Sequence, residues 1–83
     1  MDMEEKIVKI LSEICERELN VEEVSSLKDI PTELGITSLS LVYLLVELEK
    51  EFQCKINIMA LDMSCLETLE SITQFIKTCQ QQF

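Results

Sequence analysis

Residues 34–52, LGITSLSLVYLLVELEKEF, form the stretch that decides the fold. Its apolar residues stand at i, i+3, i+4, i+7 and i+11, and they are Leu41, Leu44, Leu45, Leu48 and Phe52. This repeat places all five on one face of an α-helix, where a hydrophobic core can cover them. Thr37 follows Gly35 and precedes the repeat, so it suits the N-cap position. The stretch therefore predicts a long amphipathic helix that begins beside Ser38.

The same helix carries a second apolar stripe. Leu39, Val42 and Val46 are spaced i, i+3 and i+7 and are rotated away from the core face. A helix that is apolar on two sides is either deeply buried or presents one side to a partner. Two alternatives follow: the stripe is a docking surface for other proteins, or the connection that precedes the helix covers it.

Two more long helices are expected, one before this stretch and one after it. The first begins near Met3 with Asp2 as its cap, and Asn20 is expected to end it in the left-handed conformation. Its core side is formed by Met3, Ile7, Ile10 and Ile14, with Leu11 and Cys15 widening the stripe. Thr68 is expected to cap the last helix, whose core side is formed by Leu69, Ile72, Ile76 and Cys79.

The segments between the long helices predict less regular structure. Residues 20–36 are expected to form a long loop that its spaced apolar residues pin to the bundle, with at most a short helical turn around residues 21–27. A short helix capped by Asp62 is expected within residues 57–66. Residues 55–58 alternate, but one short alternating run cannot form a stable sheet. The prediction is an all-α, four-helix bundle with three long helices and one short one, forming a single domain over residues 1–83.

Composition and charge exclude several classes of function. The chain has 16 acidic and 7 basic side chains and a net charge of −9, which argues against binding to nucleic-acid phosphates and favours partners with basic surfaces. The longest uncharged run, residues 36–46, is too short to span a bilayer and contains polar residues, so no membrane segment is expected. The N-terminus is acidic where a secretory or mitochondrial signal would be basic, which predicts a cytoplasmic protein.

The residue types present also restrict the chemistry. The chain has no histidine, so Ser-His and Cys-His nucleophilic pairs are excluded. The four cysteines include no CxxC pair, so no metal site is expected, and the thiols are interpreted as small hydrophobic side chains. A helix N-terminus favours a phosphate on Ser38, but another protein must activate that serine. No catalytic residue is therefore expected in this chain.

Residues 34–52 resemble the signature of acyl and peptidyl carrier proteins, roughly L-G-x-D-S-L followed by an amphipathic helix that ends in L-E-x-x-F. Leu19-Asn20-Val21 resembles the L-G-V turn after the first helix of that family. Residues 68–76, TLESITQFI, resemble the family's T-V-x-D-L-x-x-Y-I at the start of the last helix. The resemblance covers nearly the whole chain and implies an acyl-carrier-protein-like bundle.

The resemblance also implies a function. Ser38 would carry 4′-phosphopantetheine, which a phosphopantetheinyl transferase takes from coenzyme A, and the thiol of this arm would hold an acyl or aminoacyl group as a thioester. The protein would then be a non-catalytic, monomeric carrier that serves an adenylating loading enzyme and downstream acyl-transferring or condensing enzymes. Polyketide or nonribosomal peptide biosynthesis is the leading interpretation. The alternatives are a carrier of fatty-acid synthesis and an unmodified carrier-like binding or regulatory module.

Three positions depart from the pattern of fatty-acid carriers. Thr37 stands where those carriers usually have Asp, and Ser40 and Tyr43 stand where they generally have acidic residues. Thr can still cap the helix, so the departures concern partner recognition. They predict docking through apolar contact by Leu39, Val42 and Val46, and Tyr43 and Glu47 are expected to belong to the same docking surface.

Overall fold

The computed structural model describes residues 3–56 and 63–80, and within these ranges it contains helices and no strand. The long helices are α1 (Met3–Cys15), α4 (Ser38–Phe52) and α5 (Leu69–Gln80). The short elements are α2 (Val21–Ser25), α3 (Ile30–Glu33) and a single 3-10 turn, η2 (Met63–Leu66). The predicted all-α bundle with three long helices is confirmed.

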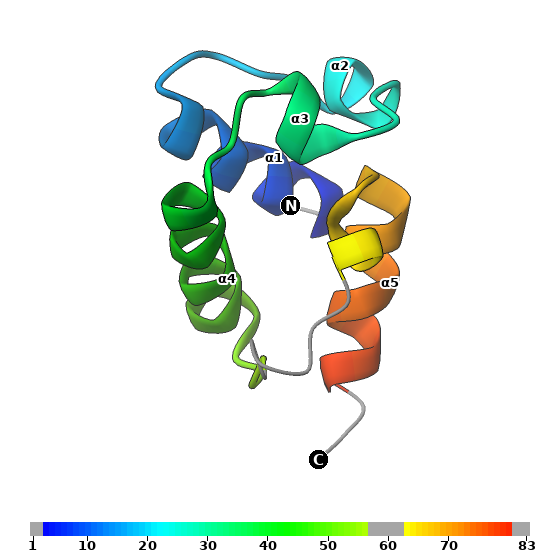
Figure 1. The fold of residues 1–83 in the computed structure, drawn as a ribbon. Coiled ribbons are helices and arrows are strands. Elements are labelled where there is room, and N and C mark those ends of the chain that lie inside the picture. Colours follow the sequence, from blue (N-terminus) through cyan, green and yellow to red (C-terminus); the bar gives the residue numbers. More distant parts are fainter. Residues whose placement is uncertain (1–2, 57–62, 81–83) are drawn as a thin grey trace.

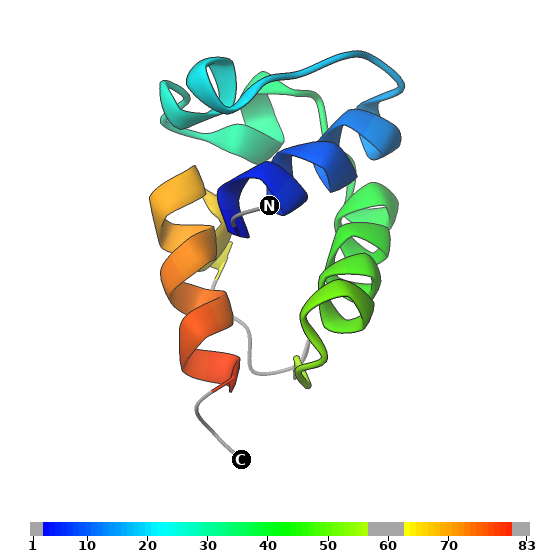
Figure 2. The ribbon, with the colours of Figure 1, turned by 180° about the vertical axis from the view of Figure 1, so that it is seen from behind.

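The three long helices surround one core. Figure 1 shows α4 along one side of the molecule and α5 along the other, while α1 crosses behind them near their upper ends. The opposite view in Figure 2 brings α1 to the front, with α2 and α3 above it. Each pair among α1, α4 and α5 is in contact, so their apolar faces meet in the middle.

The core is built from the apolar faces that the helical spacing predicts. All five predicted side chains of α4 and all four of α5 are buried. In α1 the structure adds Val8 to the predicted face and leaves Met3, Ile14 and Cys15 only half-buried. The fully buried large side chains come from every part of the described chain and are Ile7, Leu11, Val24, Ile30, Leu44, Leu45, Leu48, Leu66, Leu69, Ile72 and Ile76.

The connection between α1 and α4 is more regular than the predicted loop. The expected turn is present as α2, and α3 is an addition that the sequence interpretation lacked. Asp29 caps α3 by accepting a hydrogen bond from the Thr32 backbone at 3.4 Å. Pro31 stands in the first turn of α3, where its missing N–H leaves no helical bond unmade. The Ile30 amide donates to the carbonyl of Glu67 at 2.7 Å, which ties the connection to the segment before α5.

The expectation that Asn20 ends the first helix is wrong. Asn20 has an extended backbone and is the N-cap of α2, where its side chain accepts from the Glu23 amide at 2.7 Å. The first helix ends at Cys15, and Glu16 takes the left-handed conformation with φ 54°. Asparagine is common both at the end of a helix and as an N-cap. Here the free amides at the start of α2 give its side chain a hydrogen-bond partner, so it acts as an N-cap.

The start of α5 agrees with the prediction. Thr68 Oγ1 accepts from the Ser71 amide at 3.0 Å, and Ser71 Oγ accepts from the Thr68 amide at 3.1 Å, so the two residues cap the helix reciprocally. The short helix expected before it is the turn η2, while the caps expected at Asp2 and Asp62 lie outside the described residues. Across residues 3–56 and 63–80, no helix combines the length and the hydrophobicity needed to cross a membrane.

Candidate functional site

Ser38 is the first residue of α4, and it is exposed. Thr37 precedes it as the N-cap, with an extended backbone (φ −82°, ψ 171°), and its Oγ1 accepts from the Ser40 amide at 3.3 Å. The Thr37 hydroxyl also donates to Ser40 Oγ at 3.2 Å. These contacts hold the first turn of α4 without using the Ser38 side chain, so the serine hydroxyl is presented to solvent.

The segment before Ser38 is anchored on both sides of Gly35. Leu34 and Ile36 pack against the core, and the Ile36 amide donates to the Pro31 carbonyl at 2.7 Å. Gly35 lies between them with φ 68°, in the left-handed region that a residue with a Cβ adopts only at a cost. A Cβ there would meet no atom within 4 Å, so backbone conformation and not space calls for glycine. The anchored segment fixes where α4 begins.

The N-terminus of α4 lacks the acidic side chains that the other α-helices have in their first turns. The first turns of α1, α2, α3 and α5 all contain glutamate, which offsets the partial positive charge of a helix N-terminus. The first turn of α4 contains no acidic residue. The amides of Ser38 and Leu39 also stand where no carbonyl of the same helix can accept from them. A phosphate ester on the Ser38 hydroxyl would therefore meet a favourable field with no neighbouring carboxylate in that turn.

Next to Ser38 lies an exposed apolar surface, which we name the α4 patch: Leu39, Val42 and Tyr43. Their exposed fractions are 82%, 43% and 55%. Val46 and Glu47, the other predicted docking residues, lie one turn further along the helix and are half-buried. Of the two alternatives for the second stripe, coverage by the connection does not hold at Leu39 and Val42. The structure thus brings four apolar side chains together along one side of α4, most exposed near the serine.

The carboxylates of α4 are turned toward groups of this same chain. Glu47 lies 3.9 Å from the Lys50 ammonium, and Glu51 lies 3.9 Å from that of Lys6 on α1. Glu49 accepts from the backbone amide of Ile56 at 2.8 Å. Sequence reasoning missed the role of Lys6, because no local pattern pairs residues on two separate helices. The α4 patch consequently has an apolar and hydroxyl character, while the acidic groups lie further along the helix.

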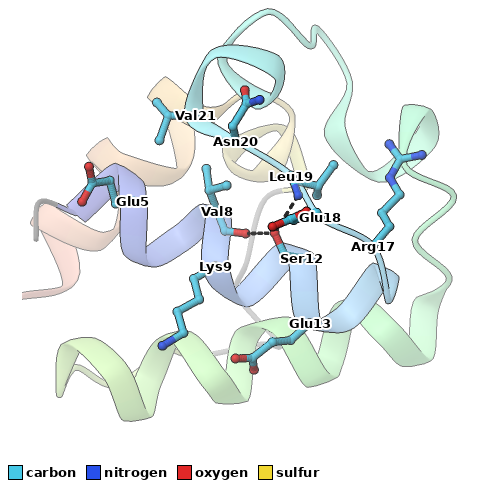
Figure 3. A pocket seen from close by; sticks show the side chains of 10 residues that line it. All are labelled: Glu5, Val8, Lys9, Ser12, Glu13, Arg17, Glu18, Leu19, Asn20 and Val21. Carbon is cyan, nitrogen blue, oxygen red and sulfur yellow. Dashed lines mark hydrogen bonds between the residues drawn. The ribbon is translucent and has the colours of Figure 1, made fainter.

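A groove of about 710 Å³ lies elsewhere, between α1 and the chain that follows it. Figure 3 shows Val8 and Leu19 within it and charged side chains of α1 around it. The Ser12 hydroxyl donates to the Val8 carbonyl at 2.9 Å and accepts from the Leu19 amide at 3.2 Å, so it joins α1 to the chain on the other side of the groove. None of its lining residues comes from α4, so the groove is separate from the serine site. In the part of the chain that the structure describes, no three metal-binding side chains are grouped.

Ser38 has no activating base among the residues of its own helix turn. The sequence contains no histidine, and the residues around Ser38 in the first turn of α4 are uncharged.

Comparison with known protein families agrees with this geometry. The family model described as "Phosphopantetheine attachment site" matches residues 5–76, from the first turns of α1 into α5. The match covers most of the chain and includes the start of α4. A search of curated proteins found no match to the chain.

Proposed function

This chain belongs to the phosphopantetheine attachment-site family, whose members carry covalently bound 4′-phosphopantetheine, and on that basis we propose that it tethers acyl or aminoacyl groups as thioesters on an arm attached to Ser38. The observation that carries the proposal is the exposed serine at the start of α4, in a first turn without acidic residues. A helix N-terminus of this kind stabilises the phosphodiester that would join the arm to the protein.

The chain's own residues would position the arm and leave the chemistry to partners. A phosphopantetheinyl transferase would remove the hydroxyl proton, and Ser38 Oγ would form a bond to the phosphorus next to the pantetheine of coenzyme A. The diphosphate bond breaks, and adenosine 3′,5′-bisphosphate leaves. The thiol at the end of the arm then forms the thioester. Thr37 and Gly35 keep the attachment point at a fixed place on the surface, and tethering raises the effective concentration of the cargo at each partner's active site. The protein is thus a carrier and cosubstrate, without a catalytic residue of its own.

Carrier proteins of this kind interact with phosphopantetheinyl transferases and acyl-handling enzymes. We assign their docking to the α4 patch, with Val46 and Glu47 at its edge. We propose that these partners are a loading enzyme of the adenylating type and condensing or acyl-transferring enzymes of polyketide or nonribosomal peptide biosynthesis. The uncharged Ser40 and Tyr43, at positions where fatty-acid carriers generally have acidic residues, support this choice. We further propose that residues 1–83 act as one carrier domain, since α1, α4 and α5 share a single core, and that the carrier works as a monomer.

Two other functions compete with this one. A carrier for fatty-acid synthesis would load its arm in the same way but would serve partners with basic surfaces. An unmodified carrier-like module would never receive the arm. Ser40 and Tyr43 stand where fatty-acid carriers generally have acidic residues, which argues against the first, and the exposed serine argues against the second.

Treatment of the purified protein with coenzyme A and a phosphopantetheinyl transferase of broad specificity tests the proposal. The intact mass should rise by one phosphopantetheinyl group, and the new thiol should then accept an acyl group from an activated donor. A chain that stays at its original mass, while a known carrier in the same reaction is loaded, would be an unmodified binding module.

A further inference from the structure

Two groups of acidic side chains differ in the partners that they have within the chain. On α4, Glu47, Glu49 and Glu51 each contact a lysine or a backbone amide of this same protein. Residues 13–23, at the end of α1 and in the chain that follows it, contain five glutamates and one arginine. The glutamates are Glu13, Glu16, Glu18, Glu22 and Glu23. All five are exposed, and none forms an ion pair with the part of the chain that the structure describes. A basic partner would therefore find available carboxylates here rather than on α4.

These glutamates stand around the groove of about 710 Å³ between α1 and the chain that follows it (Figure 3). Glu13 and Glu18 line the groove, and the other three stand within two positions of a lining residue. Its apolar side chains are Val8, which is buried, and Leu19 and Val21, which are half-buried. Lys9 and Arg17 also line the groove, but the surrounding carboxylates outnumber them. The groove thus combines an apolar floor with a rim that is mainly acidic.

The walls of the groove are held in place by hydrogen bonds. Besides the two bonds of the Ser12 hydroxyl, the Arg17 amide donates to the Ser12 carbonyl at 3.2 Å. Asn20 is fixed as the N-cap of α2 by its bond to the Glu23 amide. A partner that binds here would meet a surface that is already formed, so little of its binding free energy would be lost in ordering the chain.

We propose that this groove docks an amphipathic helix of a partner protein, one that has apolar side chains on one face and lysine or arginine beside them. The apolar side chains would contact Leu19 and Val21, and the basic ones would lie near Glu13 and Glu18. A helix is the suitable occupant because it satisfies its own backbone, and the described residues include no strand to which an extended segment could pair. Opposite charge speeds the encounter and selects basic partners over acidic ones.

The groove lies apart from the attachment point, since none of its lining residues comes from α4. A partner in the groove would hold the carrier and leave Ser38 and the α4 patch exposed to other enzymes. Tethering of this kind raises the effective concentration of the carrier at the enzymes that share its partner. The inference does not depend on the arm, because it concerns residues of α1 and the chain that follows it.

A synthetic amphipathic helical peptide of leucine and lysine is the probe that tests the inference. It is titrated into isotope-labelled Ser38→Ala protein, which has no arm, and the backbone amides are followed by nuclear magnetic resonance. The amide signals of Ser12, Leu19 and Val21 should move as the peptide binds, while those of Leu39 and Val42 should stay in place. A matched peptide in which glutamate replaces lysine should not bind.

Two substitutions with the same change in net charge separate the groove from general attraction. Glu18→Lys reverses a charge on the rim and should weaken binding of the lysine peptide roughly two- to tenfold. Glu67→Lys makes the same reversal at an exposed position that does not line the groove, and it should leave the affinity nearly unchanged. Both positions are exposed, and thermal melts of the two variants check that they fold like the parent protein.

Four results would overturn the inference. They are signal changes centred on the α4 patch, equal weakening by Glu18→Lys and Glu67→Lys, equal binding of the glutamate peptide, and no binding of the lysine peptide. Equal weakening would mean that net charge alone attracts the peptide. Failure of phosphopantetheine loading is a separate result, because the titration uses a protein without the arm.

Discussion

Thr37 and Ser40 are joined twice at the start of α4: Thr37 Oγ1 accepts from the Ser40 amide at 3.3 Å and donates to Ser40 Oγ at 3.2 Å. This pair determines where the helix begins and therefore how Ser38 is presented. Thr37→Val keeps the shape of the side chain and removes its hydroxyl, so we expect a loss of about 0.5–2 kcal/mol in the free energy of unfolding. Urea denaturation measures the loss. Thr37→Asp restores an acceptor and should restore the midpoint; equal midpoints for wild type and Thr37→Val would show that the cap is unimportant.

Leu48 is completely buried on the core face of α4. Leu48→Ala leaves a cavity between helices, and we expect it to reduce the free energy of unfolding by roughly 2–5 kcal/mol. Val42→Ala is the matched control on the same helix, because Val42 is 43% exposed and its truncation should change stability little. Thermal melts of the two variants side by side check the prediction. Similar melting temperatures would contradict the burial of Leu48 in the core, and a lower melting temperature for Val42→Ala would mean that the two faces of α4 have been assigned the wrong way round.

Leu39 is 82% exposed and lies directly after the serine, so it tests docking separately from folding. Leu39→Asp should leave the melting temperature nearly unchanged and should still be loaded, but it should be a poor substrate for enzymes that transfer acyl or aminoacyl groups. A charge in the centre of an apolar contact has to be desolvated when the partner binds. As a control, Thr78→Asp adds the same charge at an exposed position of α5, and this variant should react normally. Normal turnover by Leu39→Asp would assign recognition to another surface.

The buried thiols give the stability a defined dependence on pH. Burial raises the pKa of Cys54 and of Cys79 above the ordinary value of 9.0, so the folded protein holds these protons more tightly than the unfolded chain does. The resulting stability is fully present below the pKa of the unfolded chain and is lost as the pH rises through the higher pKa of the folded state. Urea midpoints of the reduced protein should therefore fall in alkaline solution. The fall should be smaller in the Cys54→Ala, Cys79→Ala double variant, and equal profiles would contradict the assignment.

Much of the fold follows from local patterns in the sequence. The faces of α4 and α5 were predictable because Leu41 through Phe52 and Leu69 through Cys79 repeat over several turns, and Thr37 and Thr68 precede those repeats as caps. The four residues of α3 are too few to show a period. Asp29 before Pro31 was nevertheless a readable signal, because it combines an N-cap residue with a proline suited to the first turn.

Features that depend on distant parts of the chain were not predictable. The hydrogen bond from the Leu19 amide to Ser12 Oγ ties the following connection back to α1, and no helical repeat indicates it. The ion pair between Lys6 and Glu51 joins two helices, so no local repeat indicates it. At the site, the position of Ser38 followed from the cap, whereas the exposure of the α4 patch required knowing that the connection leaves Leu39 and Val42 uncovered.

The measurement that tests the central claim most directly is the location of the arm on the loaded protein. After treatment with coenzyme A and transferase, fragmentation of the peptide that contains both Ser38 and Ser40 should place the phosphopantetheinyl group on Ser38 alone. Ser40→Ala should be loaded like the wild type, and Ser38→Ala should keep its original mass while retaining its helical circular dichroism. An arm found on Ser40 or any other serine, or loading that persists in folded Ser38→Ala, would contradict the account.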